Sequence, residues 1–426
     1  MRFVRKQTRR IRTLWLRFLP RQFRRWKHHS QLVFVCLSIT ITLNTLYGFY
    51  PGLFSLKRRK FVFSKVIAAY CFAVASIFLL FYIWHIYKEV SEGYISLRHT
   101  IETYCYMNVA VCLINFITQW PIIKPVLQFQ NSVPLFEVLN SFDIPMMLVW
   151  RAFIYAVLKI LVCPLVEYIT LILYQRRAQP DLSWTSFANI RTMLPLIVSN
   201  QINNCFFGGL VIANSIVAAI NKKLLSIVKE ANMLQTPGQM NLQKPYYRMR
   251  RFCDLADELD ELAKKYGLTA WYSKEYLRFT DWSMILSMLS MNLIGITLGL
   301  YNQYLTIADY YINEESFDLF LAIDQLVFLT VPFMEIFMVA RISNQMLQET
   351  RRTGDLLQRF DLQHADIRFK QVVNAFWLQV STIDYKLMPL GLLELNTSLV
   401  NTVFSAVIGY LLILIQSDLT LRFSLK

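Results

Sequence analysis

The chain has 426 residues, of which 55% are hydrophobic and 15% aromatic, and its mean hydropathy is +0.37. This composition excludes an ordinary soluble domain and predicts a polytopic membrane protein. The net charge is +16, and residues 1–65 hold 16 of the 44 Lys and Arg, with no Asp or Glu before Glu89. The excess charge therefore lies at the N-terminus, where a basic arm that leads into apolar segments favours contact with lipid over contact with nucleic acid.

The first apolar run covers residues 31–51 and follows this basic arm directly. If the run crossed the membrane from a cytoplasmic arm, the cluster Lys57-Arg58-Arg59-Lys60 would lie outside, against the positive-inside tendency. We therefore expect residues 31–51 to lie in the membrane interface or to re-enter the membrane. The whole of residues 1–65 is then a basic cytoplasmic N-terminal region.

Seven further apolar runs reach the roughly 20 residues that a membrane span needs. They cover residues 66–87, 101–127, 146–174, 194–222, 280–308, 317–340 and 388–416. With the N-terminus in the cytosol, the predicted cytoplasmic stretches carry 33 Lys or Arg and the external stretches carry 7. We therefore predict an all-α polytopic protein with seven transmembrane helices, a cytoplasmic N-terminus and an extracellular C-terminus.

This topology divides the chain into seven regions. After residues 1–65 come transmembrane helices one to four (66–222), a cytoplasmic helical region (223–279), helices five and six (280–340), cytoplasmic anchor helices (341–387), the seventh helix (388–416) and a short extracellular tail (417–426). In the first cytoplasmic region, Leu255, Leu259, Leu262 and Tyr266 share one helical face, and this helix is expected to end at Gly267. The two helical regions are either solvated helices that cover their own bundle or an oligomeric anchor.

The motifs of common enzymes are absent from the sequence. It has no Walker loop, GxSxG elbow, HExxH or kinase set, and its seven Cys include no CxxC. We therefore expect no enzyme activity, no metal site and no cofactor.

The seventh apolar run carries polar and small residues at helical spacing. At about 100° per residue they form one narrow stripe, and the opposite face is large and apolar. The stripe consists of Glu394, Ser398, Asn401, Ser405, Gly409, Leu412 and Gln416. Such a stripe is buried against neighbouring helices or lines a water-filled pore.

Other polar and aromatic residues fall within the predicted spans. In the orientation above, many of them would lie in the outer half of the membrane, where several helices could form a pocket open to the outside. The candidates for this ligand pocket are Glu167, Tyr168, Asn200, Gln201, Tyr301, Asn302, Asp324 and Gln325. Each residue taken alone is also explained by a hydrogen bond between helices.

The C-terminal stripe contains a motif that resembles the signature of the insect gustatory receptor family of chemoreceptor channels. That signature is a Thr-Tyr pair, five aliphatic residues and Gln-Phe, and here Tyr410, five aliphatics and Gln416 match it. Gly409 stands in place of the Thr and Ser417 in place of the Phe. The context Gly391-Leu392 and Leu395-Asn396, together with LYGFYPG near the N-terminus and the inverted seven-span topology, extends the resemblance over the whole chain.

This resemblance implies a homo- or heterotetramer in the plasma membrane of sensory neurons, with the seventh helix of each subunit lining a central cation pore. Gln416 would lie at the narrow part of the pore, with Leu412 as a hydrophobic seal one turn below, and Ile413, Gly409, Ser405 and Asn401 would complete the pore residues. Tyr410 lies on the far side of the helix and is expected to act in packing or gating. Small tastants, bitter compounds among them, are the expected ligands.

Three other functions share parts of this pattern. A seven-helix G-protein-coupled receptor would have its N-terminus outside, against the charge count. A transporter would favour internal repeats, and none is found in the sequence. A non-conducting co-receptor subunit of a heteromeric taste receptor would share every feature named above.

Overall fold

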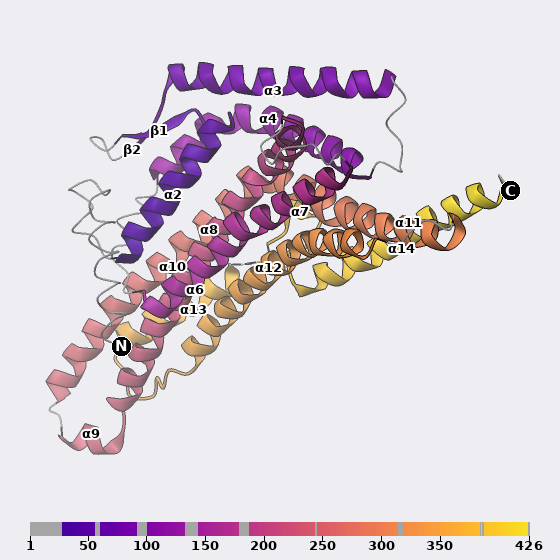
Figure 1. Cartoon of the computed structure of the whole chain (residues 1–426). Coiled ribbons are helices and arrows are strands. Elements are labelled where there is room, and N and C mark those ends of the chain that lie inside the picture. Colours follow the sequence, from indigo (N-terminus) through magenta and orange to yellow (C-terminus); the bar gives the residue numbers. More distant parts are fainter. Residues whose placement is uncertain are drawn as a thin grey trace, which may run out of the picture.

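The computed structural model describes residues 28–55, 60–91, 100–132, 144–178, 187–242, 245–313, 318–383, 385 and 387–424. The predicted basic arm before residue 28 lies outside the described residues. Within them the chain is almost entirely helical, and long helices run side by side over most of the molecule (Figure 1). Among the described residues, seven helices are long and apolar enough to cross a membrane, which confirms the predicted number of spans.

The helical elements follow one another along the chain with short connections. They are α2 (His28–Leu46), α3 (Lys65–Ser91), α4 (Thr100–Ser132), α6 (Met146–Val157), η2 (Leu158–Val162), α7 (Cys163–Ala178), α8 (Phe187–Met233), α9 (Pro237–Leu242), α10 (Pro245–Ser287), η3 (Met288–Ile294), α11 (Gly295–Asn313), α12 (Leu319–Gln358), α13 (Ile367–Thr382), η4 (Pro389–Gly391) and α14 (Thr397–Ser424). Elements η2 and η3 are π-helical turns that join their neighbours into continuous rods. Helices α8 and α12 and the rod α10–η3–α11 are far longer than the predicted spans.

The N-terminal region contains one structure that the sequence analysis does not predict. Strands β1 (Gly52–Ser55) and β2 (Lys60–Phe63) form an antiparallel hairpin after α2. Phe54 and Phe61 pair across it, and Asn131 of α4 bonds both the N–H and the carbonyl oxygen of Phe61, at 2.7 and 2.8 Å. The alternating aromatic and β-branched residues of Phe61–Phe63 explain why this segment pairs as a strand.

The predicted helix end at Gly267 is wrong. Helix α10 passes through Gly267 without a break and continues through η3 into α11 as far as Asn313. A Cβ atom at position 267 would collide with the side-chain amide of Gln379 on α13. The glycine therefore allows α13 to approach closely, and it does not act as a helix cap.

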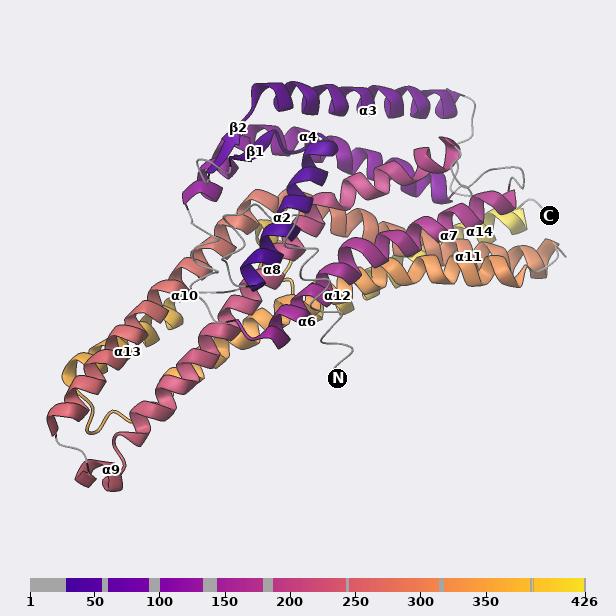
Figure 2. The same ribbon diagram turned by 60° about the vertical axis from the view of Figure 1, so that its left-hand side comes forward.

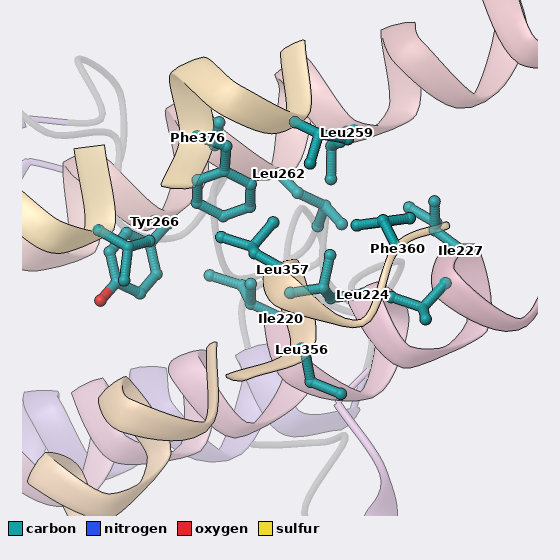
Figure 3. Packing of buried hydrophobic residues seen from close by; sticks show 14 of the residues in the cluster. Ile220, Leu224, Ile227, Leu259, Leu262, Tyr266, Leu356, Leu357, Phe360 and Phe376 are labelled. Atoms are coloured by element: carbon teal, nitrogen blue, oxygen red, sulfur yellow. The ribbon is translucent and has the colours of Figure 1, made fainter. Parts of the chain in front are cut away.

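The far ends of α8, α10 and α12 pack with α13 around one apolar core, which we call the distal core. It contains the predicted face Leu255, Leu259, Leu262 and Tyr266. Figure 3 labels the last three of these residues. Figure 2 shows these four helices running together toward α9. Phe376 of α13 packs edge-on against Tyr266, with ring centroids 5.7 Å apart. The expected amphipathic helices are thus present, and they bury their apolar faces against the extended membrane helices.

Candidate functional site

Helix α14 begins at Thr397, and this start is fixed by its capping residue. The side-chain oxygen Oδ1 of Asn396 accepts hydrogen bonds from the backbone N–H groups of Ser398 and Leu399, at 2.8 and 3.3 Å. The predicted beginning of the span at residue 388 is therefore wrong, and Glu394 lies in the preceding loop and not on the helical stripe. At the other end the helix continues past the predicted limit of 416 to Ser424.

Helix α14 has two opposite faces of different character. Leu399, Val407 and Asp418 are buried against the rest of the chain, where Val407 packs with Ile296 of α11 and Leu329 of α12. Val407 and Gln416 are nine residues apart in sequence, which at about 100° per residue places their side chains about 180° apart. The polar stripe therefore points away from the chain's own core.

The predicted pore residues lie on this outward stripe or beside it. Ser398 of the stripe and all six predicted pore residues are exposed, namely Asn401, Ser405, Gly409, Leu412, Ile413 and Gln416. Leu412 and Ile413 are 54% and 61% exposed, although both are large and apolar. Tyr410 is also 54% exposed, so within one chain it makes no buried packing contact of the expected kind. A helix this apolar with so little buried surface needs a further covering, from lipid or from another subunit.

Charged groups fix the C-terminal end of α14 to α11, and we call them the α11–α14 clamp. Arg422 Nη1 lies 2.8 Å from Asp309 Oδ1, and Arg422 Nε lies 2.6 Å from Asp418 Oδ2. The Tyr304 hydroxyl donates to the same Asp418 oxygen at 3.0 Å. Figures 1 and 2 both show α11 and α14 side by side at this end. The clamp lies on the packed face of α14 and leaves Gln416 exposed.

A small cavity lies between α4, α7, α11 and α12. Of the predicted ligand residues, Asn302, Asp324 and Gln325 line it together, beside the aromatic rings of Tyr104 and Phe328. Its volume is about 30 Å³, enough for water but far below the ~300 Å³ at which ligand pockets begin. Gly295 and Gly299 line the α11 side, where an added Cβ would meet Tyr104 and Leu329. A ligand would therefore have to widen this cavity.

The other predicted ligand residues lie elsewhere. Asn200 belongs to a buried polar network, Glu167 is buried one turn before the cavity residue Thr170, and Tyr168 packs in an apolar cluster with Tyr104. Gln201 bonds Cys205, which accepts from Asn44 of α2. Tyr301 is buried and stacks on Tyr304 near the clamp. The single pocket expected from the sequence is thus divided among several places.

The polar network around Asn200 centres on an ion pair that the sequence analysis misses. Lys159 Nζ, in the π-helical turn η2, lies 2.6 Å from Glu335 Oε1 of α12, and the two side chains are 0% and 3% exposed. Asn200 Nδ2 donates to Glu335 at 2.9 Å, and Asn203 links Asn200 to Ser287 of α10. The sequence gives one indication of this pair, because Lys159 and Glu335 are opposite charges inside two separate apolar spans.

The comparisons with known proteins identify the family of the chain. The profile of the family described as "7tm Chemosensory receptor" matches residues 37–421. The Drosophila melanogaster proteins named gustatory receptor 97a and 94a are 71% and 39% identical to the chain. They align over 100% and 93% of the chain and over 100% and 98% of their own lengths. A Drosophila melanogaster gustatory receptor for bitter taste, 93a, is 27% identical over 51% of the chain and 49% of its own length.

The fold also matches a solved insect receptor. The olfactory receptor OR5 from Machilis hrabei, solved in complex with eugenol, superposes with a TM-score of 0.60 at 11% sequence identity, over 91% of this chain and 99% of that one. The family that the profile and the Drosophila relatives indicate consists of receptors and not of enzymes. Its members are multi-pass proteins of sensory-neuron membranes. The chain therefore belongs to the insect seven-helix chemosensory receptors, within the gustatory receptor family.

Proposed function

We propose that the chain is a gustatory receptor that acts as a ligand-gated, non-selective cation channel, opened by small tastants. The observation that carries this proposal is the position of the polar stripe of α14. The stripe is exposed, on the face opposite the buried residues Val407 and Asp418. Four copies of α14 arranged around a common axis would cover the stripes together and line a wet path across the membrane.

Gln416 suits the narrow part of such a pore because its amide offers dipoles without a fixed charge. A ring of four amides stabilises a partly dehydrated cation yet releases it, whereas four carboxylates would hold it more tightly. Leu412 lies one turn away on the same face and closes the pore by excluding water. Gly409 and Ser417, which depart from the family signature, favour a second candidate, a co-receptor subunit that conducts only together with other gustatory receptors.

The ligand site in this proposal is the cavity lined by Asn302, Asp324 and Gln325. Aromatic walls and a few polar groups suit a small, mostly apolar tastant. A bitter compound is the proposed ligand class, supported by the partial similarity to the bitter-taste receptor 93a. Because α11 lines the cavity and packs against α14, widening the cavity would displace α11 and, through it, the proposed pore helix α14.

Changing Gln416 to Ala is expected to alter ion permeation and leave the agonist concentration for half-maximal current unchanged. The change removes the four proposed pore amides, and among the described residues the Gln416 side chain makes no hydrogen bond that would also be lost. Currents recorded with a ligand panel in cells that express the receptor measure the Na⁺ to K⁺ permeability ratio and block by large cations. Ser417→Ala is the control, since this neighbour is also exposed but points about 100° away. Unchanged permeation and block in Gln416→Ala would remove this residue from the pore.

Changing Asn302 to Leu is expected to raise the agonist concentration for half-maximal current by about tenfold, a loss of about 1.4 kcal/mol. The leucine has a similar size but replaces a polar wall of the cavity with an apolar one. Ile307→Leu on the same helix is the control, because Ile307 is exposed and lies outside the cavity. Equal dose–response curves for the two variants would place the ligand elsewhere.

The co-receptor alternative is distinguished by expressing the chain alone and together with other gustatory receptors. Agonist-evoked current from the chain alone supports a conducting homomer. Current only from the mixture, with permeation altered by Gln416→Ala in this chain, supports a subunit of a heteromeric pore.

A further inference from the structure

A second cavity, larger than the proposed tastant cavity, lies between α6, α8 and α12. Its volume is about 200 Å³. The polar part of its lining consists of Arg151, Tyr155, Asn214, Ser215, Gln345, Gln348 and Glu349. This group has no role in the proposed conduction path, because it lies on helices other than α14.

Glu349, the acidic residue of the lining, is held by groups other than Arg151, so the positive charge of Arg151 stays available in the cavity. Glu349 already accepts a hydrogen bond from Asn221 Nδ2 at 2.8 Å and has Arg352 Nη1 at 3.7 Å. Arg151 makes no ion pair or hydrogen bond in the part of the chain that the structure describes. An unpaired guanidinium beside neutral amide and hydroxyl donors is the chemistry that binds phosphate oxygens.

Asn214 gives an independent sign of an occupant. Its Nδ2 has only a long contact of 3.5 Å to Gln345 Oε1, and its Oδ1 is buried without a hydrogen-bond partner. Because buried polar atoms are almost always bonded and an amide oxygen only accepts, Oδ1 is expected to meet a hydrogen-bond donor that enters the cavity, such as the ammonium group of a phospholipid headgroup.

The depth of the cavity indicates what kind of molecule enters. Lys159 lies at the centre of the apolar span Met146–Leu173. Arg151 precedes it by eight residues, which at 1.5 Å per residue is about 12 Å along the helix. Half the hydrocarbon core of a bilayer is about 15 Å, so Arg151 lies close to the level of the phospholipid headgroups. Trp150 is exposed beside it, as is typical of the membrane interface.

We propose that this cavity binds the phosphate headgroup of an anionic membrane phospholipid. Arg151 pairs with the phosphate oxygens, Gln348 donates a hydrogen bond to them, and Asn214 Oδ1 accepts one from the headgroup ammonium. The acyl chains leave along the exposed apolar face of α6 toward the bilayer centre, past Ile154. The bound lipid joins α6 to α8 and α12, whose residues line the cavity, and so stabilises the bundle.

The test is the thermal stability of the purified full chain in detergent, with phosphatidylserine, phosphatidylcholine or inorganic phosphate added. Phosphatidylserine is expected to raise the Tm by several degrees more than phosphatidylcholine does, because binding to the folded state alone stabilises it. This gain is expected to disappear in Arg151→Gln and to remain in Arg341→Gln, which removes an exposed charge of α12 outside the cavity.

A second variant keeps the test decisive if Arg151→Gln folds poorly. Gln348→Phe retains Arg151 and fills the cavity, so it is expected to lose the phosphatidylserine gain as well. The proposal is overturned if phosphatidylserine stabilises the cavity variants as much as the original chain, or if it stabilises none of them. An equal gain from inorganic phosphate at the same concentration would overturn the lipid as the occupant and indicate a site for soluble anions.

Discussion

Changing Lys159 to Met is expected to destabilise the receptor by about 3–5 kcal/mol, the usual cost of leaving one partner of a buried ion pair without the other. The remaining carboxylate of Glu335 is 3% exposed and would keep only the hydrogen bond from Asn200. Glu335→Leu is expected to cost a similar amount because it leaves Lys159 unpaired. The measurements are the Tm of the purified receptor and its abundance at the cell surface.

The double variant Lys159→Met with Glu335→Leu distinguishes pairing from simple loss of packing. It removes both charges and keeps similar volumes, so it is expected to recover most of the stability that either single change loses. Arg368→Gln is the control, because Arg368 pairs with Asp257 at an exposed position where ion pairs contribute about 0–1 kcal/mol. Additive losses in the double variant would show that Lys159 and Glu335 do not stabilise each other.

This ion pair also shows which features of the receptor the sequence could not reveal. Lys159 and Glu335 are far apart in the chain, and nothing local in either span identifies the other as its partner. A lone Lys in an apolar run can extend to the membrane surface, so its burial is not determined by the run itself. The π-helical turn at Leu158–Val162 adds a local change of helix phase that a fixed period of 3.6 residues does not contain.

The residues of the predicted ligand pocket lie in different places for a related reason. Hydropathy and charge place a residue at a depth in the membrane, but they do not fix the direction in which it points. Asn200 and Gln201 are adjacent and so lie at nearly one depth, yet Asn200 bonds Glu335 of α12 while Gln201 bonds Cys205 near α2. Asn302 and Gln325 meet in one cavity because α11 and α12 pack together over this stretch.

The features that were predicted correctly depend on regular helical spacing over many residues. The number of spans follows from the length of the apolar runs. The stripe from Ser398 to Gln416 and the apolar face from Leu255 to Tyr266 follow from the 3.6-residue period. Helix ends were less predictable, since Gly267 is a helix-stop signal in sequence but a close-packing residue in the structure. Helix α14 starts where Asn396 caps it, and Asn396 is a polar residue that does not belong to the predicted stripe.

Changing Arg422 to Gln is expected to reduce agonist-evoked current at least tenfold while agonist binding is retained. The change removes both ion pairs of the α11–α14 clamp and leaves the Asp418 carboxylate, which is 4% exposed, with only the Tyr304 hydroxyl. Helix α11 lines the proposed ligand cavity at Asn302, and Asp309 lies seven residues further along the same helix. The clamp is therefore the polar connection through which movement of α11 reaches the Gln416 end of α14.

Paired changes separate this coupling from a general loss of folding. Asp309→Asn is expected to destabilise the receptor less than Arg422→Gln, because the Asp309 carboxylate is 35% exposed and its attraction to Arg422 is screened by water. It is expected to reduce the current similarly, because it removes the same ion pair between α11 and α14. The double variant Arg422→Gln with Asp418→Asn leaves no buried charge, so it is expected to regain thermal stability but not the current, since the ion pair to Asp309 is still missing. Binding of a radiolabelled agonist, Tm and current are measured on each variant. Full current in Arg422→Gln at normal surface abundance would show that α11 and α14 are coupled through their apolar contacts around Val407 and not through the clamp.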